Sequence, residues 1–194
     1  MSETTSRAAF LSRGARGGIA LVAGGSLLAA TSGQAFGAAT ADADIAKLAA
    51  TAELLAIDFY SKSIGSKKFK GNELEYLFQA RISERAHYKA LAGVLKSATP
   101  KGLSFTYPAG TFDSRLSIAK TGVALETAFV GAYLGAVTAL KSNDLKGVAA
   151  TIAASEASHL SVFSDIATGK PIIPAFPKAF TAAEATKAVT PFLG

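Results

Sequence analysis

The chain has 194 residues, of which 49% are hydrophobic and 18% are charged, and its formal net charge is +6. These proportions predict one compact domain with a well-buried core and argue against disorder. The chain contains no cysteine, which excludes disulfides, thiolate zinc sites and iron–sulfur clusters. The positive charge is mostly scattered lysine, and the one tight cluster, residues 67–70, is interpreted as a solvated loop; no nucleic-acid partner is expected.

Residues 1–41 have the order of an export signal, with a basic start, an apolar run over residues 18–30 and small residues up to Ala41. The run is too short and too weakly apolar to cross a bilayer comfortably, so no stable membrane span is expected after signal removal. Residues 6–11 resemble the twin-arginine export signal, but Ala8 stands where the second arginine is usual, so the general secretory route stays open. We expect a bacterial protein of the periplasm, cell wall or extracellular space; a disordered cytoplasmic N-terminus is the alternative.

Four long segments repeat their apolar residues with a period near 3.6, which predicts helices over residues 42–64, 72–97, 113–141 and 143–168. Asp113 and Asn143 are the expected N-caps, and Gly169 followed by Pro171 is expected to end the last helix. The first and second helices, and the third and fourth, are joined by short turns, so each pair is expected to be antiparallel.

The longer link over residues 98–112 can extend to about 50 Å, enough to run the length of a bundle. We therefore expect an all-α four-helix bundle over residues 42–169, with a long crossover between its second and third helices. Residues 170–194 contain three prolines and cannot extend the fourth helix. This tail is expected to pack over the bundle, with a short helix near residues 182–189.

The chain has only two histidines, and each lies three residues after a glutamate, in Glu84-Arg85-Ala86-His87 and Glu156-Ala157-Ser158-His159. Residues three apart on a helix are neighbours on one face, so each pair can present a carboxylate and an imidazole together. Two further glutamates, Glu53 and Glu126, stand alone within apolar helical segments. The order Glu, Glu-x-x-His, Glu, Glu-x-x-His is that of a dinuclear metal site inside a four-helix bundle.

All four glutamates lie near the middle of their predicted helices, which places them at similar depth in a bundle. Buried, unpaired carboxylates are unfavourable by several kcal/mol each and would repel one another. Two divalent cations would balance four carboxylates, with two neutral imidazoles completing the ligands. Such a set suits iron or manganese better than a structural zinc ion.

The two predicted hairpins also look like copies of one unit. The spacing from lone glutamate to paired glutamate is 31 residues in the first and 30 in the second, and a tyrosine follows each lone glutamate by seven residues, at Tyr60 and Tyr133. Such copies would place two similar half-sites face to face. These tyrosines, and Tyr88, are either ordinary core aromatics or hydrogen-bond donors and redox relays beside the site.

The pattern resembles the ferritin-like superfamily over about residues 42–168, and most of all the di-iron centre of bacterioferritin and rubrerythrin. That resemblance implies that Glu53 and His87 hold one metal and Glu126 and His159 the other, with Glu84 and Glu156 bridging. The exported, alanine-rich form with a proline-rich tail is similar to the ferritin-like group that includes desiccation-related proteins. The only methionine is Met1, so the methionine-held haem of bacterioferritin is not expected. Because the chain has no cysteine, a rubredoxin-type iron centre is not expected either.

By this resemblance the leading hypothesis is an exported oxidoreductase with two iron ions, which oxidises ferrous iron or reduces peroxide using dioxygen or hydrogen peroxide. A manganese catalase-like enzyme uses the same ligands and stays open. So does a non-enzymatic stress-protective or cell-surface binding module whose metals only stabilise the core. Assembly into a homo-oligomer is also left open, and an iron-storage cage is less favoured.

Overall fold

The computed structural model describes residues 42–171 and 174–194, so the expected export signal at residues 1–41 lies outside the described residues. The helices are α2 (Asp42–Gly65), α3 (Gly71–Leu95), α4 (Arg115–Ala139), α5 (Asn143–Thr168) and α6 (Ala182–Val189), with 3-10 turns at Lys96–Ala98 and Thr190–Phe192. Apart from one isolated bridge between Phe105 and Leu193, these described ranges contain no β-structure. The all-α prediction is confirmed.

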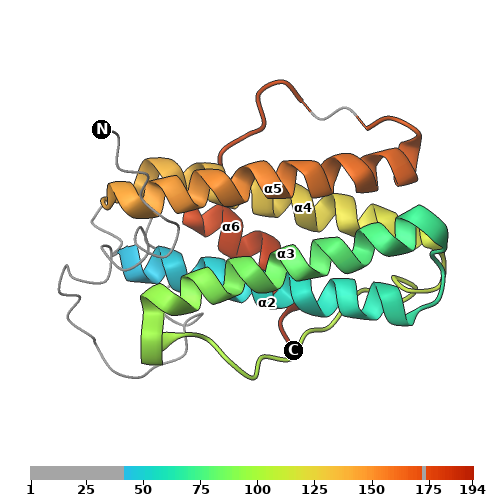
Figure 1. Cartoon of the computed structure of the whole chain (residues 1–194), viewed down its shortest axis with the longest axis horizontal. Coiled ribbons are helices and arrows are strands. Elements are labelled where there is room, and N and C mark those ends of the chain that lie inside the picture. Colours follow the sequence, from blue (N-terminus) through green and yellow to red (C-terminus); the bar gives the residue numbers. More distant parts are fainter. Residues whose placement is uncertain (1–41, 172–173) are drawn as a thin grey trace, which may run out of the picture.

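Helices α2 to α5 form the bundle as two hairpins, α2 with α3 and α4 with α5 (Figure 1). The segment between α3 and α4 runs along the bundle from one end to the other, as the long crossover requires. Side chains attach it: the Tyr88 hydroxyl donates to the Pro100 carbonyl at 2.8 Å, and the Tyr107 hydroxyl donates to the Asp58 carboxylate at 2.9 Å. The predicted ferritin-like topology is therefore confirmed.

The helix ends lie within two residues of the predicted ones, but both predicted N-caps were wrong by one residue. Ser114, not Asp113, caps α4 by accepting from the Ser117 amide at 3.0 Å. Asp113 is instead held in a turn, where its own amide donates to the Gly110 carbonyl at 3.2 Å. Ser142 caps α5, and its neighbour Asn143 is already helical. Gly169 ends α5 in the left-handed conformation at φ 71°, as predicted.

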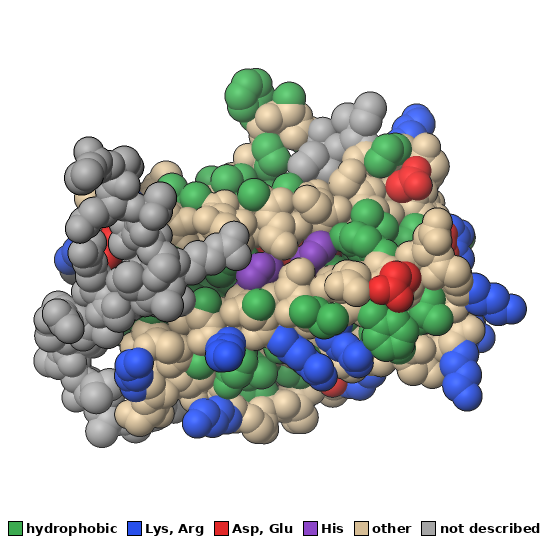
Figure 2. All heavy atoms as spheres, viewed as in Figure 1, with side chains coloured by type: hydrophobic (Ala, Val, Ile, Leu, Met, Phe, Trp, Pro, Cys, Tyr) green, Lys and Arg blue, Asp and Glu red, His purple; other side chains and the backbone are tan. Residues whose placement is uncertain are grey.

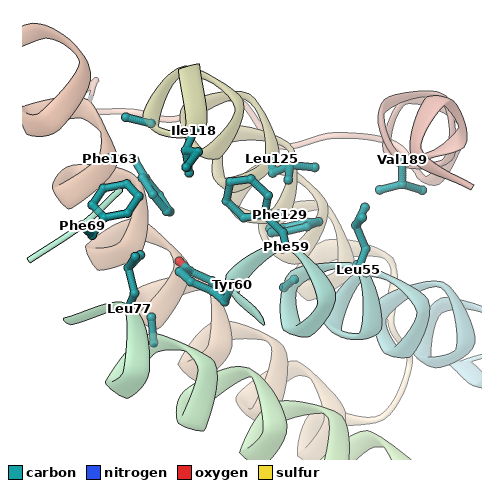
Figure 3. Close-up of a cluster of buried hydrophobic side chains, with 14 residues drawn as sticks. Leu55, Phe59, Tyr60, Phe69, Leu77, Ile118, Leu125, Phe129, Phe163 and Val189 are labelled. Atoms are coloured by element: carbon teal, nitrogen blue, oxygen red, sulfur yellow. The ribbon is translucent and has the colours of Figure 1, made fainter. Parts of the chain in front are cut away.

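The end of the bundle near the α2–α3 turn is filled by aromatic rings. Figure 3 shows Phe59, Tyr60 and Phe163 meeting from two helices within a larger apolar cluster. The ring centroids of Phe59 and Phe163 are 5.8 Å apart. A Cβ atom at Gly122 of α4 would lie 2.6 Å from the Phe163 ring, so glycine is what allows this close approach. These buried rings lie next to Glu126, to which the Tyr60 hydroxyl donates.

The C-terminal tail packs on the bundle through α6, which contacts α4 and α2. Just before α6, the Phe180 amide donates to the Gly131 carbonyl at 2.8 Å. The Phe180 carbonyl lies so close to α4 that a Cβ atom at Gly135 would stand 1.7 Å from it. The two glycines thus form a flat strip on α4 on which the tail backbone rests.

Of the helices in the described ranges, α4 alone is long and apolar enough to cross a membrane by length and composition. Half of its most apolar stretch is buried in the bundle, and the buried Glu126 lies near its middle. Core helices of bundles pass the same compositional test.

Candidate metal centre

Six side chains meet at the middle of the bundle, between all four long helices. They are Glu53 of α2, Glu84 and His87 of α3, Glu126 of α4, and Glu156 and His159 of α5. No glutamate of the set is more than 2% exposed. The structure therefore brings together every residue that the sequence nominated, and it does so because each occupies the core-facing stripe at mid-helix.

The six side chains divide into two overlapping groups of four. Within each group, the ligand atoms lie within 4.8 Å of one another. One contains Glu53 and His87, the other Glu126 and His159, and both contain Glu84 and Glu156. The two shared glutamates thus lie between the groups. This is the arrangement in which two cations can share two carboxylates.

Both imidazoles present Nδ1 to the shared carboxylates. His87 Nδ1 lies 3.2 Å from Glu84 Oε2, 3.2 Å from Glu156 Oε1 and 3.4 Å from Glu53 Oε2. His159 Nδ1 lies 2.7 Å from Glu84 Oε1 and 3.1 Å from Glu156 Oε2. Each histidine therefore faces its own helical partner and the paired glutamate of the other hairpin.

The two lone glutamates are each held by a tyrosine from the opposite hairpin. The Tyr60 hydroxyl of α2 donates to Glu126 Oε1 of α4 at 2.6 Å, and the Tyr133 hydroxyl of α4 donates to Glu53 Oε1 of α2. These tyrosines thus donate hydrogen bonds to the cluster, and both are also buried members of the apolar core. Tyr88 does not take part, since its hydroxyl holds the crossover segment instead.

One oxygen of every glutamate in the cluster has no hydrogen-bond partner: Glu53 Oε2, Glu84 Oε1, Glu126 Oε2 and Glu156 Oε1. Glu84 Oε1 lies 2.7 Å from His159 Nδ1 but has no hydrogen-bond partner. Within the described ranges no lysine or arginine lies within 4 Å of these carboxylates, and Arg81 and Arg85 are no exception. Buried carboxylate oxygens without donors are a chemical fit to hard cations.

The protein groups perturb one another strongly. Burial raises the pKa of Glu53 and of Glu126 well above the usual value for a carboxyl. Burial alone would lower the pKa of the histidines, but the surrounding carboxylates outweigh it and raise the pKa of His87 to about 12 and that of His159 to about 11. Burial also works to raise the pKa of Glu84, yet the two nearby imidazoles, His159 and His87, lower it to about 2. Cations entering this cluster must therefore displace protons.

Surroundings differ on the two sides of the cluster. The His159 side chain is 6% exposed and the His87 side chain 15%. Figure 2 shows the histidines reaching the surface in a depression of this face of the bundle. His87 of α3 is therefore the most exposed member of the cluster.

Sequence reasoning missed one residue beside the cluster, Tyr76 of α3. Its ring meets the His159 ring edge-on with centroids 6.1 Å apart, and its buried hydroxyl has no hydrogen-bond partner. Burial and the nearby charges of Glu126 and Glu84 raise its pKa. Its position in the sequence could have revealed it, because Tyr76 lies eleven residues before His87 and therefore on the same face of the helix.

A family model of the ferritin-like domain matches residues 41–169. The chain belongs to the ferritin-like domain family. No curated protein sequence was similar enough to count as a match. The family match covers all four bundle helices and all six clustered residues, so this ferritin-like domain contains a buried carboxylate–histidine cluster compatible with metal binding.

Proposed function

We propose that this ferritin-like protein is an exported dinuclear-metal redox protein that binds two iron ions and oxidises ferrous iron or reduces peroxide with dioxygen or hydrogen peroxide. The observation that supports this most is the set of four buried glutamates, each with a carboxylate oxygen that lacks a hydrogen-bond partner. Such groups are strongly unfavourable in a protein interior without compensating charge. Two divalent cations supply four positive charges against four carboxylates.

The donor types favour iron or manganese, because the cluster offers carboxylate oxygens and imidazole nitrogens and no thiolate. Glu53 and His87 would hold one ion, Glu126 and His159 the other, and Glu84 and Glu156 lie where they can reach both. When bound, a close pair of redox-active metals supplies two-electron chemistry towards an O–O bond.

The remaining parts of the site orient these ligands and control access. Tyr60 and Tyr133 hold one oxygen of each lone glutamate, which leaves the other oxygen free for a cation. The aromatic cluster around Phe59 keeps water from one end of the bundle interior. Dioxygen, peroxide and ferrous iron would enter beside the more exposed His87.

The test is metal loading of the full chain. Purified protein stripped of metal and then given Fe(II) in air should bind about two irons per chain, develop near-ultraviolet absorption of ferric iron and consume peroxide. Glu84→Gln, at a carboxylate that belongs to both groups, should lose most of this uptake, whereas Glu75→Gln, on the solvent side of α3, should behave like wild type. Uptake that is equal in both variants would contradict the proposal.

Manganese is the second candidate, because the same donors suit it. Elemental analysis of protein taken from its native host decides between the two metals. Manganese with peroxide disproportionation would replace the iron proposal. If the protein binds metal but reacts with neither dioxygen nor peroxide, the remaining function is that of a non-enzymatic binding module whose metals only stabilise the core.

Export is proposed on the sequence of residues 1–41 alone, with its basic start, apolar run and small-residue end. Protein isolated from the native cell envelope should begin near Asp42, after cleavage at Ala41. Intact mass measurement of envelope and cytoplasmic fractions tests this, and an uncleaved chain confined to the cytoplasm would refute it.

A further inference from the structure

An apolar pocket of about 360 Å³ lies on the side of the bundle that the C-terminal tail covers. Three elements line it: α2 through residues such as Leu48 and Ala52, α4 through Ala132 and Ala136, and the tail through Phe180 and Val189. Because α6 packs on α2 and α4, while the histidines come from α3 and α5, the pocket and the histidine surface lie on different sides of the bundle (Figure 1).

The lining is chemically uniform. None of the described residues that line the pocket is charged, and only Tyr133, Thr138 and Thr181 carry a polar side-chain atom. The Tyr133 hydroxyl is already committed to Glu53 of the metal centre. A wall with so few polar groups offers little to water or to an ion, and it matches a hydrocarbon surface.

The pocket is built by the fold and is not a gap left by loose packing. Gly131 and Gly135 let the tail backbone rest directly on α4, which fixes the distance between α4 and the tail wall. A capping box closes the first turn of α6, where Thr181 and Glu184 exchange hydrogen bonds of 2.8 and 3.2 Å. The alanines on the facing helix surfaces leave the space between these walls.

We propose that this pocket binds an uncharged, hydrocarbon-rich small molecule, which packs against the ring of Tyr133. At about 30 Å³ for each water-sized group, the volume holds roughly a dozen non-hydrogen atoms. Pockets of a few hundred cubic ångströms lined by apolar side chains are the usual form of small-molecule sites. A second copy of the chain fits less well, since the chain's own tail forms one wall of the recess.

This inference does not depend on the proposed redox function. None of the described residues that line the pocket belongs to the six of the metal centre, and among them only Tyr133 donates a side-chain hydrogen bond to one of the six. Ligand binding is therefore measured with metal-free and metal-loaded protein alike. Failure of one proposal would leave the other intact.

The probe is 1-naphthylamine, an uncharged aromatic molecule small enough for this volume, whose fluorescence emission shifts to shorter wavelength in apolar surroundings. The full chain should bind it saturably, one per chain, and decan-1-ol should displace it. Ala132→Phe fills the pocket from α4 and should weaken binding by at least about tenfold. Ala124→Phe, at an exposed position of the same helix, should leave binding within about twofold of wild type.

Circular dichroism establishes that each variant is folded. Should Ala132→Phe not fold, Ala182→Phe places the same bulk in the pocket from α6. Should neither variant fold, displacement of the probe from wild type by decan-1-ol is decisive. Binding that rises linearly without saturation, resists decan-1-ol, or is unchanged in a folded pocket variant would overturn the proposal.

Discussion

The two halves of the metal centre come from the same local pattern but have different surroundings. Each hairpin contributes a lone glutamate, a Glu-x-x-His pair and a tyrosine, and the contacts cross between hairpins in a matching way. Around His159 the rings of Tyr60 and Tyr76 pack edge-on at 5.8 and 6.1 Å. His87 is more exposed to the solvent than His159.

The source of the difference is visible in the repeat. Tyr76 stands eight residues before Glu84, whereas Val148 stands eight residues before Glu156. The ligand residues are thus alike in both halves, while this neighbouring position about two turns away is not. The repeated residues therefore determine which atoms can hold a cation, and the residues packed around them determine how exposed each half is.

Removing a shared glutamate should have the largest effect, because it takes a ligand from both halves. Glu84→Ala should reduce metal uptake by at least about tenfold, in line with the loss caused by removing groups at a metal site. Glu126→Ala removes a ligand from one half only and should retain about one ion per chain. Elemental analysis after dialysis measures both, and equal retention would show that Glu84 is not shared.

The two histidines should differ in what they contribute to stability. Both contact the shared carboxylates at similar distances, so replacing either loses comparable polar contacts. His159→Ala also empties a buried, ring-lined space and should cost about 2 kcal/mol, against about 1 kcal/mol for His87→Ala. Urea unfolding with a chelator present measures the difference, and equal losses would contradict the asymmetry.

Metal uptake should weaken as the pH falls. With pKa values of about 12 and about 11, His87 and His159 hold protons near neutral pH, and cations must displace them. Burial raises the pKa of Glu53 and Glu126, which adds to the same competition. If one displaced proton governs affinity, binding falls about tenfold for each pH unit lowered, and more if several do. Titration in weakly buffered solution should also detect proton release, and uptake that is independent of pH between 6 and 8 would refute this.

The sequence was sufficient to predict the bundle and the meeting of the six residues, because helical period and mid-helix position together determine depth and direction. The caps at Ser114 and Ser142 were each missed by one residue. At α4, a turn in which the Asp113 amide donates to the Gly110 carbonyl precedes the helix. Local sequence does not reveal such a turn.

The apolar pocket was also beyond sequence reasoning. It depends on where the tail comes to rest, and the strip that receives the tail consists of Gly131 and Gly135. In the sequence these glycines look like any other small residues of an alanine-rich helix. Long-range packing of residues 178–189 gives them their role, and no local pattern carries that information.

The smallest predicted effect concerns Tyr76, the residue that most distinguishes the two halves. Its hydroxyl is buried without a hydrogen-bond partner, and an unsatisfied buried polar group is destabilising. Tyr76→Phe keeps the edge-on contact with His159 and should therefore leave the free energy of unfolding unchanged or raise it by about 1 kcal/mol. Tyr60→Phe, whose hydroxyl does hold Glu126, is the matched comparison and should lower stability by a similar amount. A loss in Tyr76→Phe as large as that in Tyr60→Phe would mean that the Tyr76 hydroxyl has a partner in solution, and that the half containing His159 is closed by a hydrogen bond as well as by packing.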